Sequence, residues 1–101
     1  MQPGRDMAQE LAEKKSDAGE TETYPNYRVV LHNDERNSFD HVAKCLTRHI
    51  PGMSSDKAWN LTVKAHNEGR AIVWSGPKEV AEMYYEQLKS DGLSISLEPD
   101  V

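Results

Sequence analysis

The sequence contains very little cysteine, since Cys45 is the only one among 101 residues. A single thiol excludes an internal disulfide and favours a reducing compartment. Long apolar runs are also absent, because no segment approaches the roughly 20 apolar residues that a membrane span needs. The chain opens with neither the pattern of a signal peptide nor that of an organelle transit peptide. We therefore expect a cytoplasmic protein that does not associate with membranes.

Basic residues are too few for a general nucleic-acid-binding protein. The formal net charge is -5, whereas binding to phosphates needs a basic face. The sequence has no glycine-rich phosphate loop, no CxxC motif and no HExxH motif. Its histidines do not follow the spacing of zinc ligands with Cys45; they are His32, His41, His49 and His66. We expect no metal, no cofactor and no catalytic residue, and hence a protein that is not an enzyme.

Composition divides the chain into two parts. Residues 1–23 are acidic and polar, and their apolar content is limited to Met1, Met7, Leu11 and a few alanines. Such a segment buries too little apolar surface to offset the entropy lost on ordering. We expect residues 1–23 to be a disordered N-terminal extension and residues 24–101 to form one folded domain.

Hydrophobic periodicity predicts six elements in the second part. The elements are a strand at 27–32, a helix ending at 51–52, a helix from Ser54 or Ser55 to Gly69, a strand at 71–74, a helix from Pro77 to Asp91, and a strand at 93–97. Asn37 is predicted to cap the first helix, with Asp40 completing a capping box. The order β-α-α-β-α-β indicates an α+β domain, a three-stranded antiparallel sheet with three helices packed on it.

Residues from separate segments could form a binding pocket. Asn33 and Asp34 follow the first strand, and His66 lies near the end of the second helix. Apolar or small residues that could line a nearby cavity are Phe39, Val42, Leu61, Thr62, Ala65 and Leu93. The alternative is ordinary: Asn and Asp favour turns, and a histidine suits a helix C-terminus. Spacing alone leaves both interpretations open.

Two motifs resemble the ClpS family of Clp protease adaptors. Residues 27–35 read YRVVLHNDE, which is similar to the opening strand of that family, and residues 64–71 read KAHNEGRA, which is similar to its His-x-x-Gly-x-Ala signature. The resemblance continues through 79–82 and 93–98 and covers about residues 24–98. Residues 24–27, 50–54 and 72–77 are most similar to cyanobacterial or plastid members, although a plastid location is less favoured without a transit peptide. The same element order also resembles the C-terminal domain of the ribosomal stalk protein, a recruitment module that would not bind N-termini.

The ClpS resemblance implies an adaptor that binds N-degrons, the destabilising N-terminal residues Phe, Tyr, Trp and Leu. A free N-terminus is an ammonium group with three donors, so its site needs hydrogen-bond acceptors. The resemblance assigns that role to Asn33, Asp34 and His66, places Glu35 and Asn37 at the rim, and makes the apolar set above the pocket for the first side chain. This sequence departs from the family by having Phe39 in place of a gating methionine, Thr62 in place of a second methionine and Ala65 in place of a valine. The preferred first residue therefore stays open, with the Thr62 hydroxyl favouring tyrosine.

The resemblance also implies a partner. Family members deliver substrates to a Clp AAA+ unfoldase, and the cyanobacterial likeness favours the ClpC type over the ClpA type. Glu79 and Glu82 match residues of the family's unfoldase-contacting surface, whereas Tyr84 replaces a lysine and could instead pack in the core. The extension at 1–23 would be engaged by the unfoldase during delivery. We expect the adaptor itself to be a monomer.

Overall fold

The computed structural model describes residues 25–100, so the predicted extension at 1–23 lies outside the described residues. The elements are β1 (Asn26–His32), α1 (Phe39–His49), α2 (Ser55–Glu68), β2 (Arg70–Gly76), α3 (Lys78–Ser90) and β3 (Ile95–Asp100). This order confirms the predicted β-α-α-β-α-β arrangement. The strands form one antiparallel sheet with β1 in the centre, in the order β2-β1-β3.

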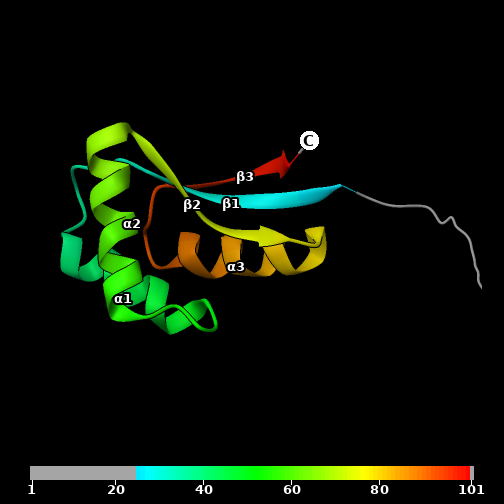
Figure 1. Cartoon of the computed structure of the whole chain (residues 1–101), viewed down its shortest axis with the longest axis horizontal. Coiled ribbons are helices and arrows are strands. Elements are labelled where there is room, and N and C mark those ends of the chain that lie inside the picture. Colours follow the sequence, from blue (N-terminus) through cyan, green and yellow to red (C-terminus); the bar gives the residue numbers. More distant parts are fainter. Residues whose placement is uncertain (1–24, 101) are drawn as a thin grey trace, which may run out of the picture.

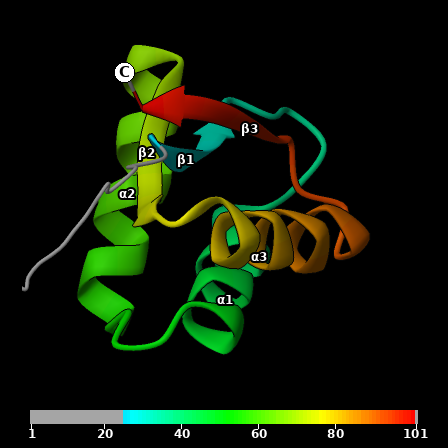
Figure 2. The same cartoon turned by 90° about the vertical axis from the view of Figure 1, so that its right-hand side faces the viewer.

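The helices form a layer on the sheet and a second group at one of its ends (Figure 1). Helix α3 packs against all three strands, and among the strands α2 packs mainly against β2. Helix α1 lies against α2 and α3, and the end view shows α1 and α3 on the same side of the sheet (Figure 2). The end of β1 therefore opens into the region between α1 and α2, which is where the candidate site lies.

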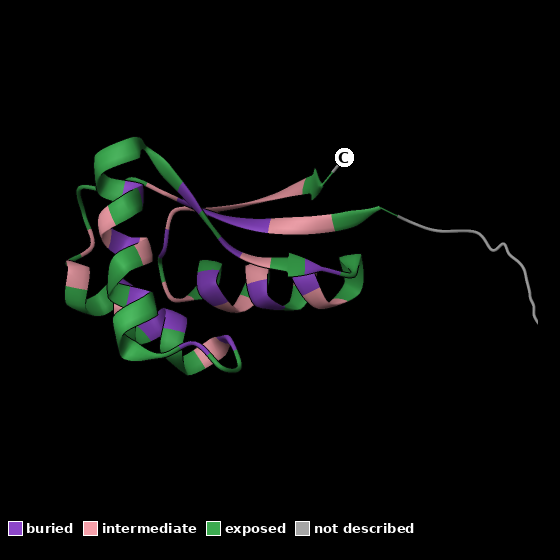
Figure 3. Cartoon of the chain, viewed as in Figure 1, coloured by how far each residue is buried: buried purple, intermediate pink, exposed green. Residues whose placement is uncertain are grey.

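The core lies between the sheet and these helices. Each helix has buried residues along one side and exposed residues along the other (Figure 3). The largest fully buried side chains are Leu31, Leu46, Leu88, Val29, Val30 and Cys45. Along β2, the register against β1 shifts so that Val73 has no partner of its own, and both Val73 and the neighbouring Trp74 pack toward the core. This irregularity is a bulge, which re-aims side chains along a strand.

Several helix ends follow the predicted signals and one does not. Ser54 caps α2, and Gly69 ends it in the left-handed region with φ 94°, as predicted. At α1 the prediction of Asn37 as the cap is wrong, because the Ser38 side chain accepts the hydrogen bond from the backbone N–H of His41. Pro77 is the residue before α3 rather than its first helical residue. Strand β3 begins at Ile95, two residues later than predicted.

Candidate functional site

Backbone pairing brings the two predicted motifs to the same place. The N–H of Asn33, directly after β1, donates to the carbonyl oxygen of Gly69 at 3.0 Å. Gly69 ends α2, so His66 in the last turn of that helix lies next to the end of β1. His32 also pairs with Arg70 at the start of β2. Residues more than thirty positions apart in the sequence thus become neighbours because the β1–β2 ladder ends at the C-terminus of α2.

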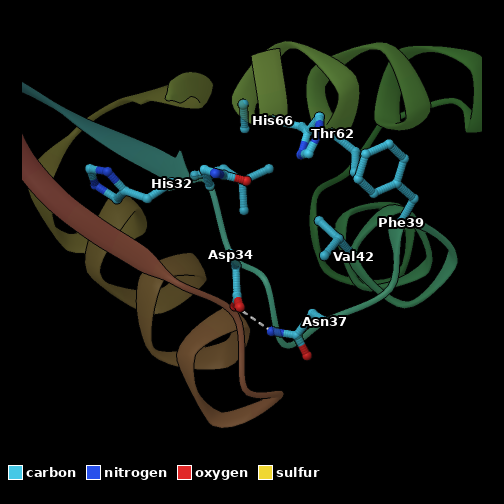
Figure 4. Close-up of a pocket in the computed structure, with 10 residues that line it drawn as sticks. His32, Asp34, Asn37, Phe39, Val42, Thr62 and His66 are labelled. Carbon is cyan, nitrogen blue, oxygen red and sulfur yellow. Dashed lines mark hydrogen bonds between the residues drawn. The ribbon is translucent and has the colours of Figure 1, made fainter. Parts of the chain in front are cut away.

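A small hollow lies between the end of β1 and helices α1 and α2 (Figure 4). Its volume is about 20 Å³, roughly the space of one water molecule. Its lining contains the three predicted amine-binding residues together with apolar and rim residues; the full set is Leu31, His32, Asn33, Asp34, Asn37, Phe39, Val42, Thr62, Ala65 and His66. A polar side and an apolar side therefore meet in a single hollow.

The Asp34 carboxylate organises the polar side. Its Oδ1 accepts a hydrogen bond from the backbone N–H of Arg36 at 2.7 Å. Its Oδ2 accepts from the Ser94 hydroxyl at 2.8 Å and from the Asn37 side-chain amide, the contact drawn in Figure 4. The same Asn37 amide donates to the carbonyl oxygen of Gly92 at 2.9 Å. Asp34 thus ties the loop after β1 to the segment that leads from α3 into β3.

These donors shift the acidity of Asp34. The backbone N–H of Arg36, followed by the Ser94 hydroxyl and the Asn37 amide, holds the pKa of the Asp34 carboxyl below its usual value, although burial acts in the opposite direction. Only 6% of the side chain is exposed. The carboxylate is therefore an ionised group fixed in the wall of the hollow, and most of its acceptor positions already have partners within the protein.

Asn33 and His66 are exposed at the mouth of the hollow. The Nδ2 of Asn33 donates to Glu35 at 3.3 Å, which leaves its side-chain oxygen as an acceptor. The His66 ring stands edge-on to Phe39, with 5.2 Å between ring centroids, and has no hydrogen-bond partner among the described residues. A neutral imidazole has one acceptor nitrogen, so both side chains can accept from a donor that enters the hollow.

The apolar side differs from the prediction in two residues. Phe39, Val42, Thr62 and Ala65 line the hollow as expected, but Leu61 and Leu93 do not. Leu93 is buried in the main core, and Leu61 packs against that core from α2. Periodicity assigns a residue to the buried face of an element, but it does not distinguish the main core from the wall of a nearby hollow.

Three residues of the site were absent from the prediction. Leu31 and His32 line the hollow from the last positions of β1, and Ser94 supports Asp34. Leu31 was recognisable as a strand residue two positions before Asn33, but the contact from Ser94 to Asp34 spans 60 positions and leaves no local signal. The predicted rim residue Asn37 lines the hollow, whereas Glu35 contacts it only through Asn33.

The Thr62 hydroxyl is already engaged within α2. It donates to the carbonyl oxygen of Ala58 at 2.8 Å, and Thr62 is buried. The hydroxyl can therefore accept, but not donate, a hydrogen bond in the hollow without breaking this contact. It offers less support for a preference for tyrosine than the sequence indicated.

A cysteine and a histidine do lie together on α1, although they do not form an activated pair. The Cys45 sulfur is 3.6 Å from Nε2 of His41. Burial, with Asp91 nearby, raises the pKa of the Cys45 thiol to about 11, so the group is protonated at neutral pH. Within residues 25–100, no three His, Cys, Asp or Glu side chains are grouped so that they could hold a metal ion. Across the same residues, no helix combines the length and apolar character needed to cross a membrane.

On α3, the structure separates the three residues predicted at the partner surface. Glu79 is exposed and Glu82 is partly exposed. Tyr84 is buried, and its ring meets Trp74 edge-on with 5.0 Å between centroids. Its role is therefore core packing, and the prediction of Tyr84 as a surface contact is wrong because its position on α3 faces the sheet.

Comparison with known proteins places this geometry in a family context. The family model described as ATP-dependent Clp protease adaptor protein ClpS matches residues 22–96. The ClpS adapter of Nostoc sp. is 55% identical over 74 residues, covering 73% of this chain and 76% of the relative. The chloroplastic adapter CLPS1 of Arabidopsis thaliana is 40% identical over 98 residues, covering 97% of this chain and 58% of the relative. A solved structure of Agrobacterium tumefaciens ClpS2 bound to L-phenylalaninamide has a TM-score of 0.69 and 27% identity, and covers 75% of this chain and 98% of that one.

Proposed function

Because this chain belongs to the ClpS family of Clp protease adaptors, we propose that it binds the free N-terminus of substrate proteins with a bulky apolar first residue and delivers them to a Clp AAA+ unfoldase. The family assignment confirms the resemblance, including its cyanobacterial and plastid character. The relatives are named adapter proteins, which are not enzymes. The family assignment also favours the N-degron adaptor over the ribosomal-stalk type of recruitment module.

The observation that carries the proposal is the convergence of unlike groups on one hollow. Asn33, Asp34 and His66 supply acceptors and negative charge, while Phe39 and Val42 belong to the apolar wall of the same hollow. An N-terminal ammonium group satisfies the first set, and the side chain of the same residue satisfies the second. Acetylated N-termini lack the charge, and polar side chains gain nothing from the apolar wall.

The magnitudes are sufficient for specific binding. Hydrogen bonds to a charged group contribute about 1.5–3 kcal/mol each. An aromatic side chain buries about 150–250 Å², which at roughly 25 cal/mol/Å² contributes about 4–6 kcal/mol before association costs. Together these terms make micromolar affinity attainable, since that corresponds to about -8 kcal/mol.

The roles of the two amine acceptors and of Asp34 differ in this proposal. Asn33 and His66 contact the ammonium directly, since their acceptor atoms are available at the mouth. Asp34 contributes mainly through its negative charge and by fixing the loop that carries Asn33, because its oxygens already accept from Arg36, Asn37 and Ser94. The structure of the Agrobacterium tumefaciens relative was solved bound to L-phenylalaninamide, which carries both a free amine and an aromatic side chain.

Delivery requires a second surface. We place contact with the unfoldase on the outer face of α3 at Glu79 and Glu82, which lies away from the hollow between α1 and α2. A ClpC-type unfoldase is the proposed partner. We also propose that the unfoldase engages residues 1–23 during delivery. This segment lies outside the described residues.

The test is a titration with a labelled peptide that begins with phenylalanine. Replacing Asn33 with alanine should weaken binding at least tenfold, because one hydrogen bond to the ammonium is lost. Replacing the exposed Asn60 on α2 with alanine is the matched control and should leave the affinity unchanged. Equal affinities of the two variants would refute the assignment of Asn33.

A further inference from the structure

The hollow is too small, as the structure has it, for the side chain that it is proposed to receive. Its volume is about 20 Å³, whereas an apolar cavity that binds benzene measures about 150 Å³. A leucine or aromatic side chain can therefore enter only when part of the wall moves. The question is which lining residue moves and what holds it in place.

Most of the apolar wall is fixed in the core. Leu31, Val42, Thr62 and Ala65 are all at least 95% buried, and buried side chains of this kind pack too closely to yield much space. Phe39 is different, because it is the first residue of α1 and is only partly buried. The Phe39 ring is therefore the wall element that can turn outward.

Two aromatic neighbours hold the Phe39 ring. Trp59 meets it edge-on with 5.6 Å between centroids and an angle of 73°, and His66 meets it at 5.2 Å and 68°. Such edge-to-face pairs stabilise their geometry beyond simple burial of area. Trp59 itself is 43% exposed on α2. Trp59 also lines a surface hollow of about 210 Å³, together with Ala43 and Ser55.

We propose, building on the proposed function, that Trp59 is a specificity-determining residue that acts through Phe39. Its indole holds the Phe39 ring across the apolar side of the hollow, so every entering side chain must displace that ring and break part of the Phe39–Trp59 contact. Wider side chains require a larger displacement. Trp59 therefore favours leucine over tryptophan as the first residue of the substrate.

The test compares two peptides that differ only in a first residue of leucine or tryptophan, bound to wild type and to Trp59→Ala. Losing the edge-to-face contact should strengthen binding of the tryptophan peptide by about two- to tenfold. Binding of the leucine peptide should change less, so the ratio of the two affinities shifts. Trp59→Phe keeps an aromatic ring and should restore most of the wild-type ratio. Ile72→Ala, which truncates a similarly exposed apolar side chain on β2, should leave the ratio unchanged.

Two outcomes would overturn the inference. An unchanged ratio in Trp59→Ala would show that Trp59 does not control the width of the hollow. Equal weakening of both peptides would show that Trp59 contacts the substrate or supports the fold instead. If wild type binds neither peptide, the proposed function fails first, and this result differs from binding with an unchanged ratio.

An independent measurement needs no ligand. Phe39 is the only phenylalanine in the chain, so selective labelling of phenylalanine gives the NMR signals of one ring. In wild type, the neighbouring Trp59 and His66 rings should shift these signals well away from the positions of a free phenylalanine. In Trp59→Ala they should move toward those positions. Unchanged signals would mean that the indole does not hold the Phe39 ring.

Discussion

Ser94 is the residue whose replacement tests the construction of the polar side most cleanly. Its hydroxyl donates to the Asp34 carboxylate at 2.8 Å, and neither partner is fully exposed. Ser94→Ala removes this donor without adding volume or charge. Two further donors, the Arg36 N–H and the Asn37 amide, remain on the same carboxylate. The variant should therefore fold, with a weakened connection between the loop after β1 and the segment before β3.

The expected loss of stability follows from the charge on the acceptor. A hydrogen bond to an ionised group contributes about 1.5–3 kcal/mol, and the lower end applies because Ser94 is only partly buried and water can replace it. A loss of about 1.5 kcal/mol corresponds to a fall in Tm of roughly 6–12 °C for a domain of this size. Because the Ser94 hydroxyl helps to lower the pKa of the Asp34 carboxyl, that pKa should rise in the variant.

The effect of Ser94→Ala on the unfolding free energy should also depend on pH, which gives a second test. The pKa of Asp34 is lowered in the folded protein, so the stability that it contributes is fully present above its ordinary value of 3.8 and is lost as the pH falls through the lower, folded value. The difference in unfolding free energy between wild type and Ser94→Ala should therefore be constant between about pH 5 and 7. It should shrink as the pH falls below 3.8 and through the lowered pKa of the folded Asp34 carboxyl.

Urea unfolding at several pH values, together with NMR titration of the Asp34 carboxyl, measures both quantities. Ser75→Ala is the matched control, because its hydroxyl donates to the exposed Asp100 at 3.1 Å and its loss should cost less than about 0.5 kcal/mol. Equal stabilities of Ser94→Ala and Ser75→Ala, with an unchanged pKa of Asp34, would refute the reasoning. The network around Asp34 would then have no energetic role.

Three further predictions concern other parts of the molecule. Cys45 should resist thiol reagents at pH 8 in the folded protein and react rapidly in urea, because burial raises its pKa to about 11; fast labelling of the folded protein would contradict this. Tyr84→Ala should lower the unfolding free energy by about 3–5 kcal/mol, whereas Tyr84→Phe should cost little, and a small effect of both in urea unfolding would contradict core packing against Trp74. Glu79→Lys should weaken binding to the unfoldase in a pull-down while leaving the affinity for the peptide unchanged. Glu86→Lys, which is also on α3, is the charge-matched control. If the unfoldase retains both variants equally, Glu79 is not a contact residue.

Much of the fold was predictable because its signals are local. Apolar spacing located the helices, and strong terminators such as Gly69 and Gly92 fixed their ends, since both adopt positive φ angles that favour glycine. The Asn37 cap was wrong for a reason that the sequence does not contain. Asn37 is occupied by contacts with Asp34 and with Gly92, which lies 55 positions away, so the next residue caps the helix instead.

The candidate site was predictable to a lesser degree. The motifs around Asn33 and His66 located the polar side, but the sequence could not show that the Asp34 carboxylate is already bound by Ser94. The apolar residues were harder still. Leu61 and Leu93 were predicted on the same grounds as Val42, and only the three-dimensional packing shows that Leu93 is buried in the core and that Leu61 packs against it without lining the hollow.

The most direct measurement is the affinity of one labelled peptide beginning with phenylalanine, determined once with a free amino terminus and once with that terminus acetylated. Acetylation removes the positive charge and leaves the side chain unchanged. Losing about two charge-assisted hydrogen bonds costs at least about 3 kcal/mol, so the acetylated peptide should bind more than about 100-fold more weakly. If the two peptides bind with the same affinity, the hollow formed by Asn33, Asp34 and His66 does not recognise an N-terminal ammonium group.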